Sequence, residues 1–78
     1  MDWKLNNGTL EKTVKLASFT QIIQKLNEIA VMCDKINHHP DITIYNYRFI
    51  RFNLVTHSEG KVTEKDYELA KEIDRLVS

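Results

Sequence analysis

Residues 18–37, SFTQIIQKLNEIAVMCDKIN, form the longest periodic stretch of the sequence and decide the fold. Ser18 followed three residues later by Gln21 is a capping box, a pattern that begins many helices. Asn37 suits the other end, because asparagine tolerates the left-handed conformation in which many helices terminate. The pattern predicts a helix of about five turns over residues 19–36. Its apolar side chains recur at helical spacing, at Phe19, Ile22, Ile23, Leu26, Ile29, Ala30, Cys33 and Ile36.

The residues before this helix alternate between apolar and polar, as strands with one wet face do. Trp3 and Leu5 have polar neighbours, and Asn-Asn-Gly at residues 6–8 supplies the positive-φ residues of a tight turn. The apolar side chains Leu10, Val14 and Leu16 then share one parity. The sequence therefore predicts a β-hairpin of residues 2–6 and 9–16.

Two further alternating runs follow the helix. Ile42 and Ile44 predict a short strand over residues 42–45, and the run from Tyr47 to His57 predicts a longer one. In the longer run Ile50, Phe52 and Leu54 lie on one side. Asn46 lies between the two runs, where we expect it to help turn the chain.

A second helix is predicted at the end of the chain. Residues 58–61, Ser-Glu-Gly-Lys, have the composition of a loop. Thr63 and Asp66 then form a second capping box, with aspartate where glutamate is usual. Tyr67, Leu69, Ala70, Ile73 and Leu76 or Val77 define an apolar stripe that runs to the C-terminus.

These elements predict an α+β fold in the order β-β-α-β-β-α. A four-stranded antiparallel sheet with both helices packed on one face is the simplest way to bury the apolar stripes. The opposite face of the sheet is expected to be polar. All 78 residues fit one domain, 1–78, and a chain this short is marginally stable unless subunits associate. We therefore expect a homo-oligomer, a dimer or a tetramer.

Composition excludes several classes of protein. The formal net charge is zero and lysines alternate with acids, so the basic stripe of a nucleic-acid binder is absent. No apolar stretch approaches the roughly 18 residues of a membrane span, and no signal-peptide pattern opens the chain. The single cysteine, Cys33, excludes an internal disulfide and fits a cytoplasmic or nuclear location. We expect neither a nucleic-acid nor a membrane partner.

The three histidines are the candidate chemical groups. His38 and His39 are adjacent and precede Pro40, and His57 closes the fourth predicted strand. Imidazole is the side chain that exchanges protons near neutral pH. If the last two strands form a hairpin, its open end brings His57 back beside the histidine pair. Three imidazoles at one edge of the sheet indicate a proton-transfer site.

Two other interpretations compete with proton transfer. A histidine pair at a helix C-terminus is often only a favourable charge at the negative end of the helix dipole, and composition alone does not decide against this. A zinc site is disfavoured, because the short fixed spacings of strong zinc sites are missing and Cys33 lies on the apolar helix stripe. No metal is expected.

The sequence resembles the pterin-4a-carbinolamine dehydratases over about residues 17–77. That family's signature is an acidic residue, then His-His-Pro, an aromatic residue, a strand ending in Thr-His, and an aspartate. Here these elements are Asp34, His38-His39-Pro40, Tyr47, Thr56-His57 and Asp66, in order and at the expected spacing. Trp3 matches a tryptophan before the family's first hairpin. Family members usually carry a helical segment before that tryptophan, and this sequence starts almost at it.

The resemblance implies dehydration of 4a-hydroxytetrahydropterin to quinonoid dihydropterin, with no organic cofactor or metal. His38, His39 and His57 would be the acid–base groups, and which is acid and which is base stays open. The resemblance implies substrate contacts at Pro40, Thr56, Ser58, Glu59 and Trp3. Asp34 and Asp66 would orient the imidazoles, although a capping or surface role fits each of them equally well.

A non-catalytic role is the alternative. Some relatives serve as dimerisation cofactors of a transcription factor, and others are thought to serve protein assembly. The broad apolar stripe of the helix over residues 19–36 favours self-association or a protein partner on that helix. The sequence does not separate these two.

Overall fold

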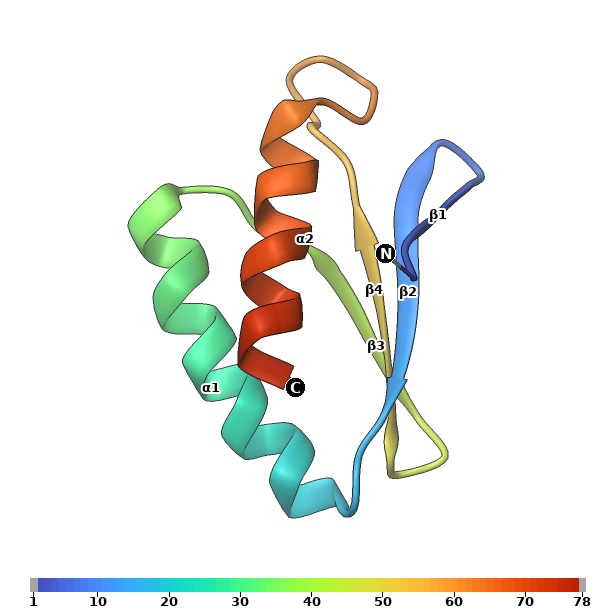
Figure 1. Cartoon of the computed structure of the whole chain (residues 1–78), viewed down its shortest axis with the longest axis vertical. Coiled ribbons are helices and arrows are strands. Elements are labelled where there is room, and N and C mark those ends of the chain that lie inside the picture. The colour runs from blue at the N-terminus through green and yellow to red at the C-terminus, as the bar shows by residue number, and fades with distance from the viewer. Residues whose placement is uncertain (1, 78) are drawn as a thin grey trace.

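The computed structural model, which describes residues 2–77, is a four-stranded antiparallel sheet with two helices against one face, as predicted. Figure 1 shows the sheet nearly edge-on with both helices on the same side. The strand order is β1-β2-β4-β3, which leaves β1 and β3 at the two edges. The elements are β1 (Lys4–Asn6), β2 (Thr9–Lys15), α1 (Phe19–Ile36), β3 (Asp41–Tyr45), β4 (Phe49–Leu54) and α2 (Glu64–Val77). Neither helix is long and apolar enough to cross a membrane within this part of the chain.

Helix α1 begins and ends at the predicted residues because both ends are capped. Ser18 Oγ accepts a hydrogen bond from the Gln21 amide at 3.1 Å. The Gln21 side chain reaches back and accepts from the Ala17 amide at 2.8 Å. At the other end Asn37 adopts the left-handed conformation, with φ of 53°, and its amide donates to the Cys33 carbonyl. The chain therefore leaves α1 in a fixed direction, straight into His38.

The turns explain where the strands stop. Asn7 and Gly8 both have positive φ, as the tight β1–β2 turn requires. The fourth strand is shorter than the predicted 47–57, because Asn46 and Tyr47 both adopt positive φ and belong to the β3–β4 turn. At its other end the strand stops at Leu54, and Thr56 instead forms an isolated bridge with Lys61. His57 therefore lies in a loop and not at a strand end, because that bridge turns the chain away from the sheet.

The core lies between the sheet and the helices. Phe52, Ile50 and Leu54 of β4 are completely buried, and Ile22, Ile29 and Cys33 of α1 and Leu69, Ala70 and Ile73 of α2 pack in the same core cluster. Two buried side chains are polar, Thr56 and Asp66. Burying a carboxylate costs free energy unless it accepts hydrogen bonds. The hydrogen-bond partners of Asp66 therefore decide whether its burial is tolerated.

The opposite face of the sheet is polar over most of its area, as expected, with an aromatic exception at one end. Its residues include Glu11, Thr13, Thr43 and Asn53, which pair across the strands. Tyr45 and Phe49 also point to this face, and their rings stack with centroids 5.3 Å apart.

Candidate active site

His38 is held by the buried carboxylate of Asp66. The Nε2 atom of His38 lies 2.7 Å from Oδ1 of Asp66, and the imidazole is largely enclosed. His38 follows the left-handed Asn37, and its own amide donates to the Cys33 carbonyl at 3.2 Å. Asp66 lies in the first turn of α2. The pair therefore joins the end of one helix to the start of the other.

Asp66 is satisfied on both oxygens. Its Oδ2 accepts hydrogen bonds from Thr56 Oγ1 at 2.8 Å and from the Thr63 amide at 2.9 Å. Thr56 and Thr63 hydroxyls lie 2.7 Å apart. Because a hydroxyl has one proton and Thr56 spends its proton on Asp66, Thr63 must donate to Thr56. The carboxylate thus caps α2 through the Thr63 amide and also contacts the His38 ring, whereas a purely surface position is excluded by its burial.

The hydrogen-bond network also assigns the ring nitrogens of His38. A carboxylate that accepts on Oδ2 from two donors is best completed on Oδ1 by an Nε2–H donor. The other nitrogen, Nδ1, makes no hydrogen bond within residues 2–77. In a neutral ring this nitrogen carries the lone pair, so it is the atom at which His38 can take up a proton.

His39 pairs with the second acidic residue of the motif. Its Nε2 lies 2.9 Å from Oδ1 of Asp34 on α1, and both side chains are mostly exposed. The two adjacent histidines therefore face different carboxylates, one buried and one in solvent. Asp34 also acts on Cys33: burial first, and then the negative charge of Asp34, raise the pKa of the thiol.

His57, Ser58 and Glu59 lie exposed on one compact loop. The Thr56 carbonyl accepts from the amides of Glu59 and Gly60, and the Thr56 amide donates to the Lys61 carbonyl. Gly60 has φ of 68°, a conformation that favours glycine. The loop is therefore closed on Thr56, whose hydroxyl contacts Asp66.

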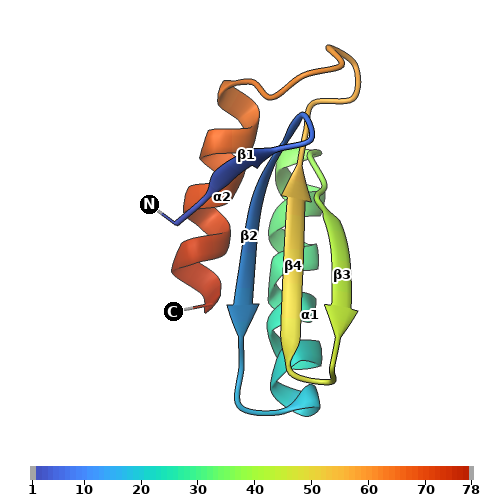
Figure 2. The ribbon, with the colours of Figure 1, turned by 90° about the vertical axis from the view of Figure 1, so that its right-hand side faces the viewer.

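The loop and the α1–β3 connection lie at the same end of the molecule. Both views of the ribbon place them there, opposite the β3–β4 turn (Figures 1 and 2). Pro40, half-buried, leads from His39 into β3. The path His38–Asp66–Thr56 connects the histidine pair to the residue before His57. No hydrogen bond joins His57 to the other two histidines within residues 2–77, so the close meeting of all three imidazoles stays a prediction.

Trp3 has a structural position. Its indole is buried, packs against Phe52 with ring centroids 6.1 Å apart, and donates from Nε1 to Asp74 of α2 at 3.0 Å. Lys12 also bonds Asp74, at 2.7 Å. The hydrogen bond and ring contacts that the described residues give Trp3 involve Asp74, Phe52 and Lys12 and no histidine, so its predicted role at the substrate stays untested.

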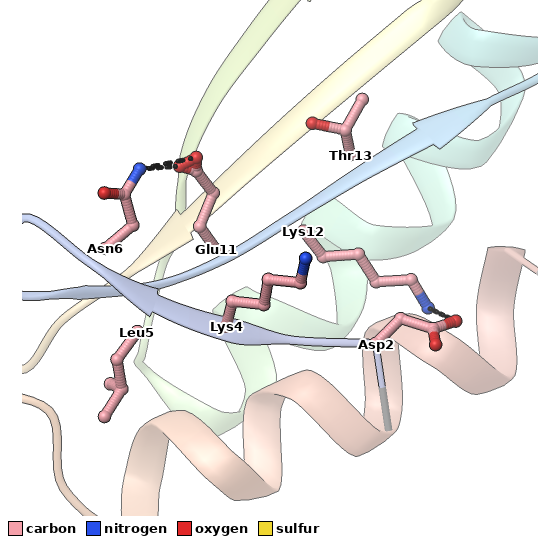
Figure 3. Close-up of a pocket in the computed structure, with 7 residues that line it drawn as sticks. All are labelled: Asp2, Lys4, Leu5, Asn6, Glu11, Lys12 and Thr13. Atoms are coloured by element: carbon pink, nitrogen blue, oxygen red, sulfur yellow. Dashed lines mark hydrogen bonds and ion pairs between the residues drawn. The ribbon is translucent and has the colours of Figure 1, made fainter.

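An open hollow of about 600 Å³ lies elsewhere, along the β1–β2 hairpin (Figure 3). Its charges face one another: Asn6 donates to Glu11, and Lys12 lies 4.0 Å from Asp2. None of the predicted site residues lines it. Size alone does not make this hollow the site, because the histidine–carboxylate pairs lie elsewhere and four of its polar side chains, Asn6, Glu11, Lys12 and Asp2, already pair with one another.

The arrangement at the histidine end suits proton transfer. Two imidazoles are oriented by carboxylates, and the better buried one keeps a free nitrogen. Such carboxylate–imidazole pairs orient general acids and bases in many enzymes. Within residues 2–77, no three His, Cys, Asp or Glu side chains are grouped as metal ligands would be.

Comparison with known proteins places the chain in a family. The family model described as pterin 4 alpha carbinolamine dehydratase matches residues 1–76. The chain belongs to the pterin-4a-carbinolamine dehydratase family. Proteins that carry this family name provisionally include one from Sulfolobus acidocaldarius, 42% identical over 95% of this chain and 80% of that protein. Another, from Mycolicibacterium smegmatis, is 40% identical over 97% of this chain and 80% of that protein.

Solved structures share the dehydratase fold. A transcriptional coactivator/pterin dehydratase from Brucella melitensis superposes with a TM-score of 0.91 at 24% identity, covering 99% of this chain and 83% of that one. A pterin dehydratase-like protein described as a RuBisCO assembly factor in the α-carboxysome superposes with a TM-score of 0.82 at 18% identity, covering 100% and 92%. At these identities the likeness concerns the fold.

One residue of the candidate site is not predicted from the sequence. Thr63 was predicted only as a helix cap, yet its hydroxyl completes the hydrogen-bond network under His38. Two features of the sequence could have indicated this role of Thr63: the Thr56-His57 pair and the Thr63-x-x-Asp66 cap. Only the packing of the 56–61 loop on α2 shows that the two belong together.

Proposed function

We propose that this chain dehydrates 4a-hydroxytetrahydrobiopterin, or a related 4a-hydroxytetrahydropterin, to the quinonoid dihydropterin for recycling of tetrahydrobiopterin. The observation that supports this most is the His38–Asp66 pair, a shielded imidazole with a fixed tautomer and a free Nδ1. The family match is the independent support.

The reaction eliminates water, and the protein has to supply only proton transfer. The N5–H bond breaks, its electrons form the N5–C4a double bond, and the C4a–O bond breaks as the hydroxyl leaves as water. One group must accept the N5 proton and another must protonate the departing oxygen. Neutral and protonated imidazoles near pH 7 do both. The proposal therefore calls for no organic cofactor and no metal.

The histidines would share this work. In our proposal His38 exchanges its proton through Nδ1 while Asp66 stabilises the charged ring. His39 and His57, both exposed, are placed to approach the substrate from the solvent side. Pro40 would fix the backbone of His39, and Ser58, Glu59 and the main chain of Thr56 would offer polar groups to the pterin edge. Trp3 is the least direct candidate, because its indole is committed to the core.

The first prediction concerns activity. The carbinolamine is generated in situ with an aromatic amino acid hydroxylase, and its decay is followed with wild type and with His38→Ala, His39→Ala and His57→Ala. Wild type should accelerate the decay above the spontaneous rate. Loss of His38 should reduce kcat/KM by about 10²–10⁴-fold, the usual contribution of a positioned acid or base.

Two results would contradict this proposal in different ways. No acceleration by wild type would remove the dehydratase function. Acceleration that survives removal of all three imidazoles would leave the function and refute the mechanism. Lys35→Ala, an exposed residue of α1, is the control for an ordinary surface change and should keep wild-type activity.

A second candidate function is protein binding through α1. Phe19, Ile23, Val31 and Ile36 of this helix are each at least 40% exposed. Phe19 and Ile23 lie one turn apart, whereas Val31 and Ile36 lie elsewhere around the helix, so α1 exposes apolar side chains on more than one side. Exposed apolar groups favour self-association or a partner protein. Two solved structures of this fold are described as a coactivator and as an assembly factor, which supports such a role without assigning a partner here. We propose that the helix mediates a homo-oligomer, a dimer or a tetramer.

The second prediction tests assembly. Light scattering should give a mass that is a multiple of the 9.2 kDa chain. Val31→Glu, which places a charge at a 60% exposed position, should shift the mass towards the monomer while far-ultraviolet circular dichroism stays unchanged. A monomeric wild type at all concentrations would contradict self-association. Lys25→Glu, a charge change on the same helix, is the matched control.

A further inference from the structure

The open face of the sheet carries a cluster of cations and aromatic rings near the β3–β4 turn. That turn lies at the end of the sheet opposite the α1–β3 connection, which contains His38 and His39 (Figure 2). Across the strands Lys15 pairs with Phe49 and Phe49 with Tyr45. In the next row Arg51 lies between Thr13 and Thr43. We call this the turn-end cluster, and it consists of Lys15, Tyr45, Tyr47, Arg48, Phe49 and Arg51.

Each cation in the cluster lies over a ring. Lys15 Nζ is 5.8 Å from the Phe49 centroid, and Arg51 Cζ is 5.6 Å from the Tyr45 centroid. Arg48 Cζ is 5.9 Å from the ring of Tyr47, and its Nε donates to the Leu16 carbonyl. Each contact of this kind is a weak attraction at an exposed site. The rings therefore favour side-chain positions that keep the three positive charges within the cluster.

These charges have no acidic partner. Within residues 2–77, no carboxylate forms an ion pair with Lys15, Arg48 or Arg51. The acids on this face, Glu11 and Asp41, lie in the row of Asn53 towards the histidine end. The face is therefore positive at one end and acidic at the other, although the chain as a whole has no net charge.

Tyr47 adds an independent observation. It has φ of 52° and is 61% exposed. A bulky aromatic residue rarely adopts this conformation, because it strains the backbone and costs free energy. Strain of this kind often persists at functional positions. The family motif includes an aromatic residue at this position, yet Tyr47 lies in the β3–β4 turn, whereas His38 precedes the other end of β3. The dehydratase proposal gives Tyr47 no task.

We propose that the turn-end cluster binds an acidic, extended segment of another protein. Arginine forks bind carboxylates in a bidentate manner, and here their counter-charges are missing. The cluster is a row of side chains on an open sheet face, and the hollow at the β1–β2 hairpin includes none of them, so an extended chain fits it better than a small ligand that needs an enclosed pocket. Single-stranded nucleic acid is the competing occupant, because Tyr45 and Tyr47 are exposed rings on which bases can stack, and an oligothymidylate is therefore included in the test.

The third prediction tests this surface with a defined probe. The probe is a fluorescein-labelled peptide in which glutamate alternates with threonine, so that an extended chain puts its carboxylates on one side. Its fluorescence anisotropy should rise on addition of the protein, and added salt should weaken the binding. The double substitution Lys15→Gln/Arg51→Gln should weaken binding by about tenfold.

Controls separate charge in general from this site. Lys35→Gln/Lys71→Gln removes the same charge from the helices and should change the affinity by less than about twofold. Tyr47→Gly should weaken peptide binding without lowering the melting temperature, because glycine relieves the backbone strain. The proposal is overturned if the Lys15/Arg51 variant binds as well as wild type, or if a glutamine–threonine peptide binds equally well. It is also overturned if an oligothymidylate binds more tightly than the acidic peptide.

Discussion

Asp66 is the residue on which the site depends most. A completely buried carboxylate is tolerated here because three donors meet it: His38 Nε2, the Thr56 hydroxyl and the Thr63 amide. Asp34 is the opposite case, an exposed carboxylate beside an exposed imidazole. The same pairing of acid and imidazole therefore has very different energetics at the two histidines.

The fourth prediction compares these two acids. Asp66→Asn replaces an acceptor by an amide whose NH₂ group must face a donor, so we expect a loss of about 1–3 kcal/mol in the free energy of unfolding. Asp34→Asn should change it by less than about 0.5 kcal/mol, as exposed substitutions usually do. Urea denaturation measures both. Equal effects of the two substitutions would contradict the assignment of Asp66 as a buried hub.

Single residues also show where sequence reasoning stops. The sequence predicts Asp34 and Asp66 as candidate orienters of the imidazoles, with capping or surface roles equally open, and it does not say which acid meets which histidine. His38 and Asp66 are 28 positions apart, so only the packing of α2 against α1 shows that they pair. The positive φ of Tyr47 was not foreseen, since aromatic residues normally indicate strand.

At the scale of elements, α1 controls the direction of the histidine pair. Asn37, which follows the last residue of α1, adopts the left-handed backbone conformation. The amides of Asn37 and His38 both donate to the Cys33 carbonyl. Local chemistry at the helix ends is visible in sequence, so Ser18, Gln21 and Asn37 were predicted correctly. The two ends of the fourth strand were predicted wrongly. The positive φ of Asn46 and Tyr47 moves its start, and the Thr56–Lys61 bridge follows its end at Leu54.

The fifth prediction uses this helix end. Asn37→Ala places a Cβ without a compensating side-chain bond in the left-handed region, and should destabilise the fold by about 1 kcal/mol. Asn37→Gly should be neutral or slightly stabilising, because glycine adopts this conformation freely. Thermal unfolding compares the two variants. If alanine and glycine behave alike, the left-handed cap is not what fixes the path into His38.

At the scale of the molecule, the protein consists of a helix layer and a sheet layer. The helix layer and the sheet enclose one core, and the histidine site lies where the ends of α1, α2 and β4 meet. The order of the elements and the burial of one sheet face followed from periodicity alone. The charge separation across the open face did not, because it depends on which residues the strand register brings side by side.

The double role of Asp66 ties the chemistry of the site to the cooperativity of folding. The first turn of α2 cannot fray without releasing Thr63 and exposing the carboxylate, and the carboxylate cannot leave without freeing His38. Local opening of that turn and loss of the oriented imidazole are therefore one event with one free energy. A ligand that rests on His38 would protect the amide of Thr63 from hydrogen exchange, although it need not touch that amide.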